Sequence, residues 1–389
     1  MQNFVLENPT KIIFGRDTIN LIGSETAAFG KKVLLVYGRS SVKKNGLFDQ
    51  TMDSLQEAGL SVIEHGGVRS NPVLSHVREG IELAKKEQIE VICALGGGSV
   101  IDSAKAISAG ALVEHDVWQF FKGKKSIKKT IPLTCVLTLA AAGSEMNGGM
   151  VITNEETDQK FGTGNKLLHP NVSILNPTAT FTVPPDYTAY GAVDAIAHIL
   201  EFYFTTRDPA TPVQDRFMEG LVINIMESCD RVLVNPEDYA ARADLMWCAT
   251  LALNGWTAAG LGLVGFPMHM IEHSLSALYN VPHGAGLSVV VPAWMKYQAA
   301  KNPTKFNQFA ERVFQISAKN ASKKASAGIN QLKGWFSRSG SPTSLAELKI
   351  PLTDIPKISE NALKLGKIWR LRDYDQKMIE EILLLCADS

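Results

Sequence analysis

The sequence predicts an α/β domain followed by an all-helical domain, and three observations support this expectation. Short apolar runs alternate with amphipathic helical stretches in the first half of the chain. Strand patterns nearly vanish after Val183-Pro184-Pro185, where long helical periodicities begin. The 389 residues are also enough for two domains, at roughly 100–200 residues each. We therefore expect the first domain at 1–184 and the second at 185–389.

The expected strands of the first domain are apolar and rich in β-branched residues. Runs at 33–37 and 91–95 each end at a glycine, as buried parallel strands do before a turn. Between them, 49–58 and 74–86 carry apolar residues at helical spacing. Further strand-like runs occupy 133–139, 150–153 and 172–175. Such alternation is typical of a parallel sheet with helices on both faces.

The second half carries long apolar periodicities at helical spacing. The expected helices include 193–204, 215–234 and 239–253. The stretch 317–326 is polar enough to be a mobile connection between helices.

Composition disfavours several classes of protein. The 39 basic and 39 acidic side chains sum to zero, without the basic surplus typical of nucleic-acid binding. The five cysteines are scattered without a C-x-x-C spacing, so no disulfide framework is expected. No secretory pattern starts the chain, and no apolar run approaches the roughly 20 residues of a membrane span. We expect a cytoplasmic protein without membrane or nucleic-acid partners.

A glycine turn follows the expected strand at 91–95. Gly96-Gly97-Gly98-Ser99 opens a helix near 100–108, where glycines and unpaired N–H groups favour a pyrophosphate. Ser99 and Asp102 also fit a helix-capping pair, and the plain alternative is a tight strand-to-helix turn. A second turn, Gly38-Arg39-Ser40-Ser41, ends the earlier strand at the same expected sheet edge. The letters G-x-G-x-x-G at 260–265 lack a preceding strand, so we assign them to an interhelical loop.

Histidines and one aspartate recur at helical spacing in the second half. Asp194 and His198 stand four residues apart, as do His269 and His273, and His283 follows. A carboxylate with several imidazoles suits a divalent metal such as Fe²⁺ or Zn²⁺. Asp194 lies among Ala, Val and Ile, where an unpaired carboxylate would be costly and a cation would offset that cost. Each histidine alone would more often be a hydrogen-bonded core residue.

The same letters allow a rival interpretation. His269-Met270-Ile271-Glu272-His273 matches H-x-x-E-H, in which both histidines bind zinc and the glutamate serves as the base of a metallopeptidase. That hypothesis leaves Asp194, His198 and the glycine turn unused, so it ranks second.

At these residues the chain resembles the iron-dependent (group III) alcohol dehydrogenases, in particular the butanol dehydrogenase and NADPH-dependent aldehyde reductase branch. The resemblance spans essentially the whole chain. It is carried by Asn8–Gly15, Gly96–Asp102, Met246–Thr250, His273–Tyr279 and the set of Asp194 with three histidines. It implies a Rossmann-like dinucleotide-binding domain followed by an all-α metal-binding domain, a dehydroquinate synthase-like architecture. It also implies hydride transfer between NAD(P)H and a simple aldehyde or primary alcohol, and a homodimer.

The resemblance also implies roles for individual residues. Asp194, His198, His269 and His283 would hold the metal, Fe²⁺ first and Zn²⁺ as the alternative, and His273 would face the nicotinamide and relay a proton. The cofactor-binding residues would be Gly38, Arg39, Ser40, Asn71, Gly97, Gly98, Ser99, Asp102, Thr138 and Lys160.

Two positions depart from the family pattern, and a third bears on the choice of cofactor. Ala142 replaces the threonine of the usual T-G-S-E segment, and Asn176 replaces an aspartate before Pro177. At Arg39, NAD-specific relatives often carry an aspartate, whereas arginine suits a 2′-phosphate by geometry and charge. We therefore predict NADP(H) over NAD(H), although Arg39 could also be a solvated surface residue.

Phe266 and Met268 suggest a pocket for alkyl chains or, alternatively, core packing. A zinc polyol dehydrogenase of the same fold and a non-enzymatic metal-binding protein remain alternatives.

Overall fold

A computed structural model describes residues 1–207 and 210–387, which fall into two compact units. The α/β unit comprises Glu7–Val183 and Pro236–Thr250. The helical unit comprises Met1–Leu6, Pro184–Asn235 and the chain from Leu251 onward.

These units differ from the two uninterrupted domains expected at 1–184 and 185–389. The first six residues belong to the helical unit, and 236–250 returns to the α/β unit. Aromatic contacts hold the returning segment: Trp247 meets Phe14 edge-on with ring centroids 6.1 Å apart, and the Arg16 guanidinium lies 3.8 Å from the Tyr239 ring centroid. The partners are far apart in the sequence, so no local pattern reveals them.

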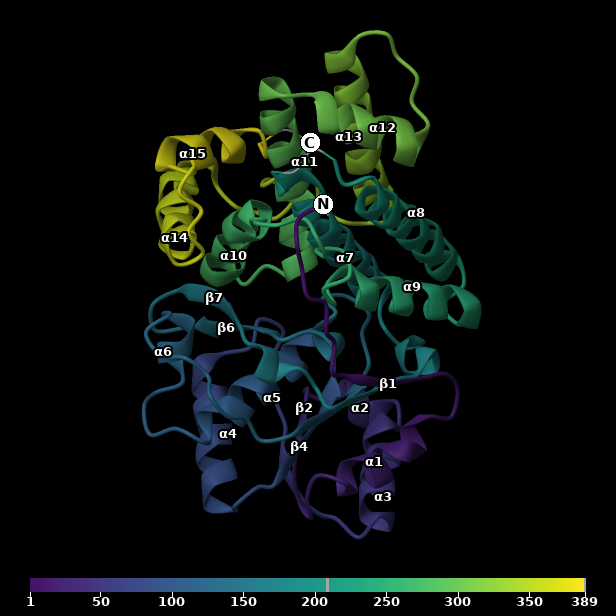
Figure 1. The fold of residues 1–389 in the computed structure, drawn as a ribbon, viewed down its shortest axis with the longest axis vertical. Helices are drawn as coiled ribbons and strands as arrows, with labels where there is room; N and C mark the ends of the chain where they lie inside the picture. Colours follow the sequence, from purple (N-terminus) through teal and green to yellow (C-terminus); the bar gives the residue numbers. More distant parts are fainter. Residues whose placement is uncertain (208–209, 388–389) are drawn as a thin grey trace. The chain divides into compact units, whose positions relative to one another are not determined.

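The α/β unit is built on a parallel six-stranded sheet of order β1-β8-β5-β4-β2-β3. Figure 1 labels three of its strands, β1, β2 and β4. Its strands are β1 (Lys11–Phe14), β2 (Lys32–Tyr37), β3 (Ser61–His65), β4 (Val91–Gly96), β5 (Leu133–Leu137) and β8 (Val172–Leu175). A separate antiparallel hairpin consists of β6 (Gly149–Asn154) and β7 (Gln159–Gly164). The side chains of β4 and β5 are buried along their whole length, as expected for strands covered on both faces.

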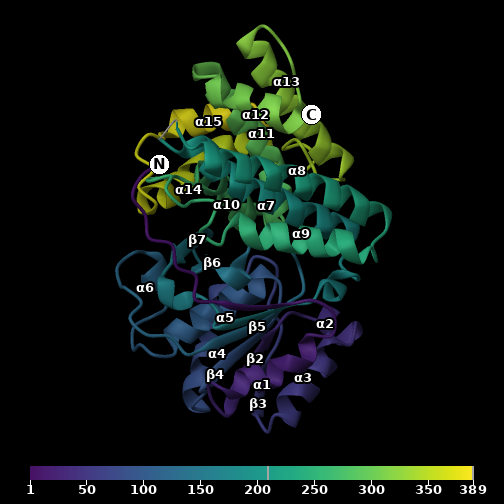
Figure 2. The ribbon, with the colours of Figure 1, turned by 45° about the vertical axis from the view of Figure 1, so that its right-hand side comes forward.

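Helices cover both faces of this sheet, with α4 on one side of the strands and α1 and α3 on the other (Figure 2). The helices are α1 (Ile22–Ala27), α2 (Ser41–Lys44), α3 (Leu47–Glu57), α4 (Leu74–Lys86), α5 (Gly98–Gly110) and α6 (Trp118–Phe121). Four 3₁₀ helices are η1 (Ile19–Leu21), η2 (Ser144–Met146), η3 (Lys166–Leu168) and η4 (Pro177–Thr180). The core against α1 and α3 includes Ile22, Leu35 and Leu55, all fully buried.

The helical unit contains no strand within its described residues, which confirms the expected fold class. Its elements are α7 (Pro185–Thr205), α8 (Pro212–Val234), α10 (Pro267–Tyr279), α11 (His283–Lys301), α12 (Thr304–Phe314), α13 (Ala321–Arg338), η5 (Leu352–Asp354), α14 (Ile355–Ile368) and α15 (Gln376–Leu384). Helix α9 (Tyr239–Ala252) starts in the α/β unit and ends in the helical unit. Within the helical unit α11 packs against α7, and α10 packs against α11 and α14. These contacts bring α7, α10 and α11 together.

The polar stretch at 317–326 was expected to be a mobile connection, and this was wrong for its second half. Helix α13 begins at Ala321, and the Asn320 side chain caps it by accepting from the backbone N–H of Lys323 at 3.0 Å. The asparagine at position 320 predicts the start of a helix, whereas polarity alone does not distinguish an exposed helix face from a loop. No helix in the described part of the chain is both long and apolar enough to cross a membrane.

Candidate functional site

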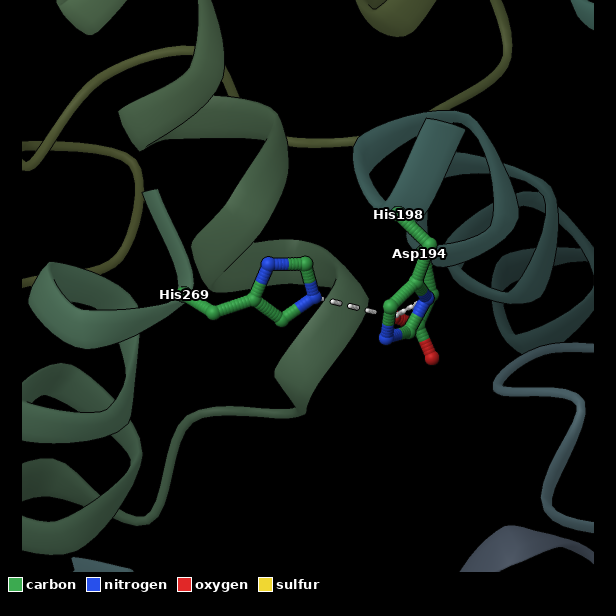
Figure 3. Close-up of side chains that lie close together, drawn as sticks. All are labelled: Asp194, His198 and His269. Atoms are coloured by element: carbon green, nitrogen blue, oxygen red, sulfur yellow. Dashed lines mark ion pairs between the residues drawn. The ribbon is translucent and has the colours of Figure 1, made fainter. Parts of the chain in front are cut away.

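A carboxylate and three imidazoles converge inside the helical unit. Asp194 and His198 project from α7, His269 projects from α10, and His283 is the first residue of α11. Oδ1 of Asp194 lies 3.2 Å from Nδ1 of His198, 3.8 Å from Nε2 of His269 and 3.6 Å from Nε2 of His283. His269 reaches from α10 toward the pair on α7 (Figure 3). The structure therefore gathers all four residues that the resemblance assigned to the metal.

The chemistry of this cluster fits a divalent cation. Oδ1 of Asp194, Nδ1 of His198 and Nε2 of His269 are buried and have no hydrogen-bond partner. Buried polar atoms in proteins nearly always have a hydrogen-bond partner or a bound ion. Three buried polar atoms without a partner in one place therefore indicate that a further group, such as a cation, binds there. Donor atoms bound at about 2.1 Å in a tetrahedral arrangement lie roughly 3.4 Å apart, which is close to the spacing here. Nitrogen and carboxylate oxygen are suitable ligands for Fe²⁺ or Zn²⁺.

The electrostatics of the cluster favour an ionised Asp194 carboxylate beside a neutral His198 ring and a protonated His269 ring. Burial would raise the pKa of Asp194, but the imidazoles of His198, His283 and His269 outweigh it and hold that pKa well below the usual range. Burial lowers the pKa of His198 to about 3, against the pull of Asp194, so this ring is neutral near pH 7. Burial alone would lower the pKa of His269, yet the nearby carboxylates of Asp194 and Glu201 raise it to about 9.

Two buried glutamates accept hydrogen bonds from the ring Nδ1 atoms of His269 and His283. The sequence did not predict this role for either glutamate. Oε1 of Glu201 lies 2.8 Å from the backbone nitrogen of His269 and 3.0 Å from its ring Nδ1. Oε2 of Glu272 pairs in the same way with Nδ1 of His283. Each carboxylate accepts the Nδ1 proton and leaves Nε2 toward Asp194, which fixes both tautomer and ring direction. A glutamate inside the apolar run Ile199–Phe202 was the signal that could have found Glu201.

The position of Glu272 argues against the metallopeptidase hypothesis. Its carboxylate is fully buried and already accepts from His283 and from the Ser276 hydroxyl. His269 groups with Asp194 and His198, whereas His273 groups with Glu272 and His283. The donor atoms of His269 and His273 therefore fall in different groups, which does not favour one zinc ion held by both.

Aromatic rings border the histidine cluster. Phe266 lies 5.4 Å from His269 and 6.3 Å from His198, and Trp369 lies 5.4 Å from His273, measured between ring centroids. Phe266 and Trp369 are both partly exposed, whereas Met268 is fully buried. Of the two residues expected beside an alkyl pocket, Met268 is therefore part of the core and Phe266 remains available.

The α/β unit places the two glycine turns side by side at its carboxyl edge. Gly38 follows β2 and Gly97 follows β4, and these neighbouring strands flank the point where the strand order reverses. A Cβ on Gly38 would lie 3.9 Å from a methyl of Val100 on α5. Thr138 follows β5 on the other side, and its backbone N–H donates to Gly96 at 3.1 Å. Three predicted cofactor residues thus share one sheet edge.

The start of α5 is open to a ligand. Gly97 is the N-terminal cap and offers no side chain, so no side-chain group caps the helix. A Cβ on Gly97 would approach Cβ of Leu139 at 3.0 Å, and one on Gly98 would approach Cβ of Ala142 at 3.4 Å. The 139–142 segment therefore passes close to the turn and leaves little room for a side chain at Gly97, while the N–H groups stay available for an anion.

The other predicted cofactor residues have mixed outcomes in the structure. Asn71 and Lys160 are both buried, and the Lys160 ammonium donates to Oδ1 of Asn71 at 3.0 Å. Arg39 and Ser40 are exposed just after Gly38, whereas Ser99 is partly exposed in the first turn of α5.

The predicted capping pair of Ser99 and Asp102 is wrong. Asp102 instead accepts from the Ser144 hydroxyl at 2.6 Å and from the backbone N–H of Val151 at 2.9 Å. Its carboxylate faces the segment that leads into β6 rather than back toward the start of α5.

At the departure Asn176, the side chain caps η4 by accepting from the N–H of Thr178 at 3.0 Å. Asparagine offers the same acceptor oxygen as the usual aspartate, so the substitution preserves this cap.

Two family models match most of this chain. The iron-containing alcohol dehydrogenase family model matches 9–177, and the C-terminal model of the Fe-containing alcohol dehydrogenase family matches 188–387. The probable NADH-dependent butanol dehydrogenase 1 of Bacillus subtilis is 40% identical, over 98% of this chain and 99% of that protein. The NADPH-dependent aldehyde reductase YqhD of Escherichia coli is 36% identical, over 92% of both chains.

A solved structure is similar over the whole chain. The NADH-dependent butanol dehydrogenase A of Thermotoga maritima superposes with a TM-score of 0.95 at 46% identity, covering 100% of this chain and 99% of that one. The chain belongs to the iron-containing alcohol dehydrogenase family. It is accordingly a metal-dependent oxidoreductase that uses a nicotinamide cofactor, which confirms the resemblance read from the sequence.

Proposed function

We propose that this enzyme interconverts simple aldehydes and primary alcohols, with butanal as a representative substrate, and prefers NADP(H). The convergence of Asp194, His198 and His269 with orphaned donor atoms is the observation that carries the proposal. Phe266 and Trp369 support an alkyl substrate, because their partly exposed rings offer apolar surface beside the histidines. A polyol would need several polar partners there, which favours the simple aldehyde over the zinc polyol dehydrogenase alternative.

Asp194, His198, His269 and His283 would hold the metal. A divalent metal at this site would supply Lewis-acid stabilisation of the negative charge that develops on the substrate oxygen. Glu201 and Glu272 orient the imidazoles of His269 and His283 by accepting their Nδ1 protons.

His273 is the proposed proton relay. It is 97% buried, and its ring lies 5.4 Å from the His283 ring between centroids. Its imidazole can carry a proton on a ring nitrogen, so it can release that proton to the substrate oxygen during reduction and recover it during oxidation. A His273→Ala variant should lose the most activity at the pH values at which proton transfer by His273 is needed. Full activity of this variant across the pH range would refute the proposed proton relay.

The cofactor would bind along the carboxyl edge of the sheet. Gly97, Gly98 and Ser99 would hold the pyrophosphate, and Gly38, Arg39 and Ser40 would border the adenosine ribose. Asn71, Asp102, Thr138 and Lys160 complete the proposed set. Arg39 is exposed in this region, as are Lys43 and Lys44, but the Lys43 ammonium lies 3.4 Å from the Glu64 carboxylate and 4.2 Å from the Phe48 ring centroid.

The preference for NADP(H) therefore depends on Arg39. The wild-type enzyme should show a higher kcat/KM with NADPH than with NADH, and Arg39→Asp should reverse the order by removing a cation and adding a carboxylate. Lys44→Asp serves as a control for a general change of charge nearby. A wild-type enzyme that favours NADH would refute this preference without affecting the reaction itself.

We also propose a homodimer in the cytoplasm. Among the described residues β1 pairs only with β8, so its outer edge is open, and Phe14 and Trp247 beside it are 40% and 39% exposed. The five cysteines are buried free thiols, as suits a reducing compartment. Light scattering should give twice the chain mass for the wild type and less for Trp247→Glu, and a monomeric wild type would refute the dimer.

The reaction is tested by following NADPH and NADH absorbance with butanal. The metal is then removed with a chelator and either Fe²⁺ or Zn²⁺ is returned. We expect oxidation of the cofactor that chelation abolishes and metal restores. No oxidation of either cofactor with any simple aldehyde would refute the proposal.

A further inference from the structure

Lys105 is a fully buried cation that the reaction described above does not use. It lies on α5 two turns after the glycine turn, and its side chain has no exposed surface. A buried ammonium is costly unless oxygen atoms surround it. Burial lowers its pKa to about 8, so it is still largely protonated at neutral pH.

Its ammonium is surrounded by oxygen atoms from one short segment of chain. Nζ donates to the carbonyl oxygens of Ser144, Asn147 and Gly149 at 2.7, 2.8 and 2.8 Å. It also lies 2.9 Å from the Ser144 hydroxyl and 3.2 Å from Oδ1 of Asn147. Five oxygens from 144–149 therefore share three protons, and the segment is folded around the cation.

Asp102 completes this arrangement one turn earlier on the same helix. Its carboxylate accepts from the Ser144 hydroxyl at 2.6 Å and from the Val151 N–H at 2.9 Å. The Ser144 hydroxyl thus donates to Asp102 and accepts from Lys105. Removing either charge would leave the other facing a segment arranged for both.

The segment held by these two residues adjoins the proposed pyrophosphate site. The chain that enters this segment passes the glycine turn: a Cβ on Gly97 would lie 3.0 Å from Cβ of Leu139, and one on Gly98 would lie 3.4 Å from Cβ of Ala142. Within the segment, the side-chain amide of Asn147 donates to the carbonyl oxygen of Gly143 at 2.8 Å.

The end of the segment leads to two further proposed cofactor residues. It continues into β6 and β7, and β7 carries Lys160, whose ammonium contacts Asn71. The N–H of Thr153 on β6 donates to the carbonyl of Pro72 at 2.8 Å, which fixes the hairpin beside the Asn71 turn.

We propose that Lys105 and Asp102 are positioning residues that pre-shape the nicotinamide cofactor site by folding 142–151 against the glycine turn. Lys105 does not need to touch the cofactor, and Asp102, which belongs to the proposed cofactor set, acts on the site through this segment. The inference rests on the proposed location of the cofactor at Gly97–Ser99, and it goes beyond it by assigning the rigidity of that site to the hydrogen bonds that two side chains of α5 make to 144–151.

The test is the affinity of Lys105→Met for NADPH, measured by fluorescence or calorimetry. Methionine keeps an unbranched side chain of similar length but removes the charge and all donors. We expect the Kd for NADPH to rise at least about tenfold, since a loosened site must be ordered when the cofactor binds. The metal content should stay at the wild-type value, because the metal residues are not on this segment.

Lys85→Met is the matched control. Lys85 lies on the neighbouring α4 and donates to a single carbonyl, that of Val113, at 2.9 Å. It should leave the Kd unchanged. A folded Lys105→Met protein with a wild-type Kd for NADPH would overturn the inference. So would a Lys85→Met control that weakens NADPH binding as much as Lys105→Met does. If the wild type itself does not bind NADPH or NADH, the proposed function fails instead.

A measurement on the wild type keeps the inference testable if Lys105→Met does not fold. Hydrogen exchange should find the amides of Gly149 and Val151 protected without cofactor, because they donate to Asn147 and Asp102. Saturating NADPH should change that protection by less than about twofold. Rapid exchange that slows only with NADPH would show that the cofactor orders the segment, and this would overturn the inference.

Discussion

At the scale of residues, the metal cluster depends on two carboxylates that orient imidazoles. Glu201 and Glu272 are both fully buried, and each pairs with the Nδ1 side of one histidine. The spacing of Asp194 with His198 and of His269 with His273 pointed to a metal, and the structure brings Asp194, His198 and His269 together. The partners of the imidazoles depend on how α7, α10 and α11 pack, so spacing along one helix could not predict them.

Glu201→Gln should weaken metal binding by roughly 10–100-fold. Glutamine keeps the shape and can still accept from Nδ1 of His269, but it lacks the negative charge that makes the imidazole a better ligand. The Kd for Zn²⁺ or Fe²⁺ of the metal-free protein is the quantity to measure.

Glu227→Gln is the control for that experiment, because Glu227 is exposed on α8. It should bind metal as the wild type does. An unchanged metal Kd in Glu201→Gln would contradict the orienting role of Glu201.

At the scale of elements, close approach between helices places His283. Gly284 and Gly286 follow it in the first turn of α11. A Cβ on Gly284 would lie 2.0 Å from the Tyr190 carbonyl oxygen of α7, and one on Gly286 would lie 2.6 Å from the Glu272 carboxylate.

The sequence predicted α4 at 74–86 with its observed bounds, since amphipathic periodicity sets them. It did not predict β1, β3 or β7, whose existence depends on partners elsewhere in the chain.

Gly284→Ala should separate α11 from α7 and move His283 away from Asp194. Overpacking of this kind costs about 1–3 kcal/mol, so the melting temperature should fall by several degrees and metal affinity should fall with it. Thermal unfolding by circular dichroism measures the first effect.

Gly220→Ala on α8 is the matched substitution, because a Cβ there would meet nothing within 4 Å. It should stabilise the protein by about 0.5–1 kcal/mol through helix propensity. Equal melting temperatures for Gly284→Ala and Gly220→Ala would contradict the close approach.

The end of β3 gives a prediction for acid stability. His65 is buried and stacks on His76 with ring centroids 4.1 Å apart, and burial lowers its pKa below the usual 6.5. Below about pH 6.5 the unfolded chain therefore binds a proton that the folded form resists, so stability falls as the pH falls through this window.

His65→Gln removes that titration. The loss of melting temperature between about pH 7.5 and about pH 5.5 should be smaller in this variant than in the wild type. His115→Gln is the control, because His115 is partly exposed, whereas His65 is buried. An equal loss in His65→Gln and wild type would exclude His65 as a source of acid sensitivity.

At the scale of the whole molecule, an α/β unit carries the proposed cofactor site and a helical unit carries the metal cluster. The change of pattern at Val183-Pro184-Pro185 was visible in the sequence, because a sheet buried on both faces and a helical bundle need different periodicities. The return of 236–250 to the α/β unit was not visible, because Trp247 and Tyr239 lie on an amphipathic helix like any other.

The central claim is that Asp194 and its three histidines hold the metal that the reaction requires. The most direct test is the metal content of purified wild type, Asp194→Asn and the control Asp186→Asn, an exposed aspartate on the same helix. We predict about one metal ion per chain in the wild type and control, and less than about a tenth of that in Asp194→Asn, with aldehyde reduction lost in proportion. A full equivalent of metal in Asp194→Asn would contradict the account.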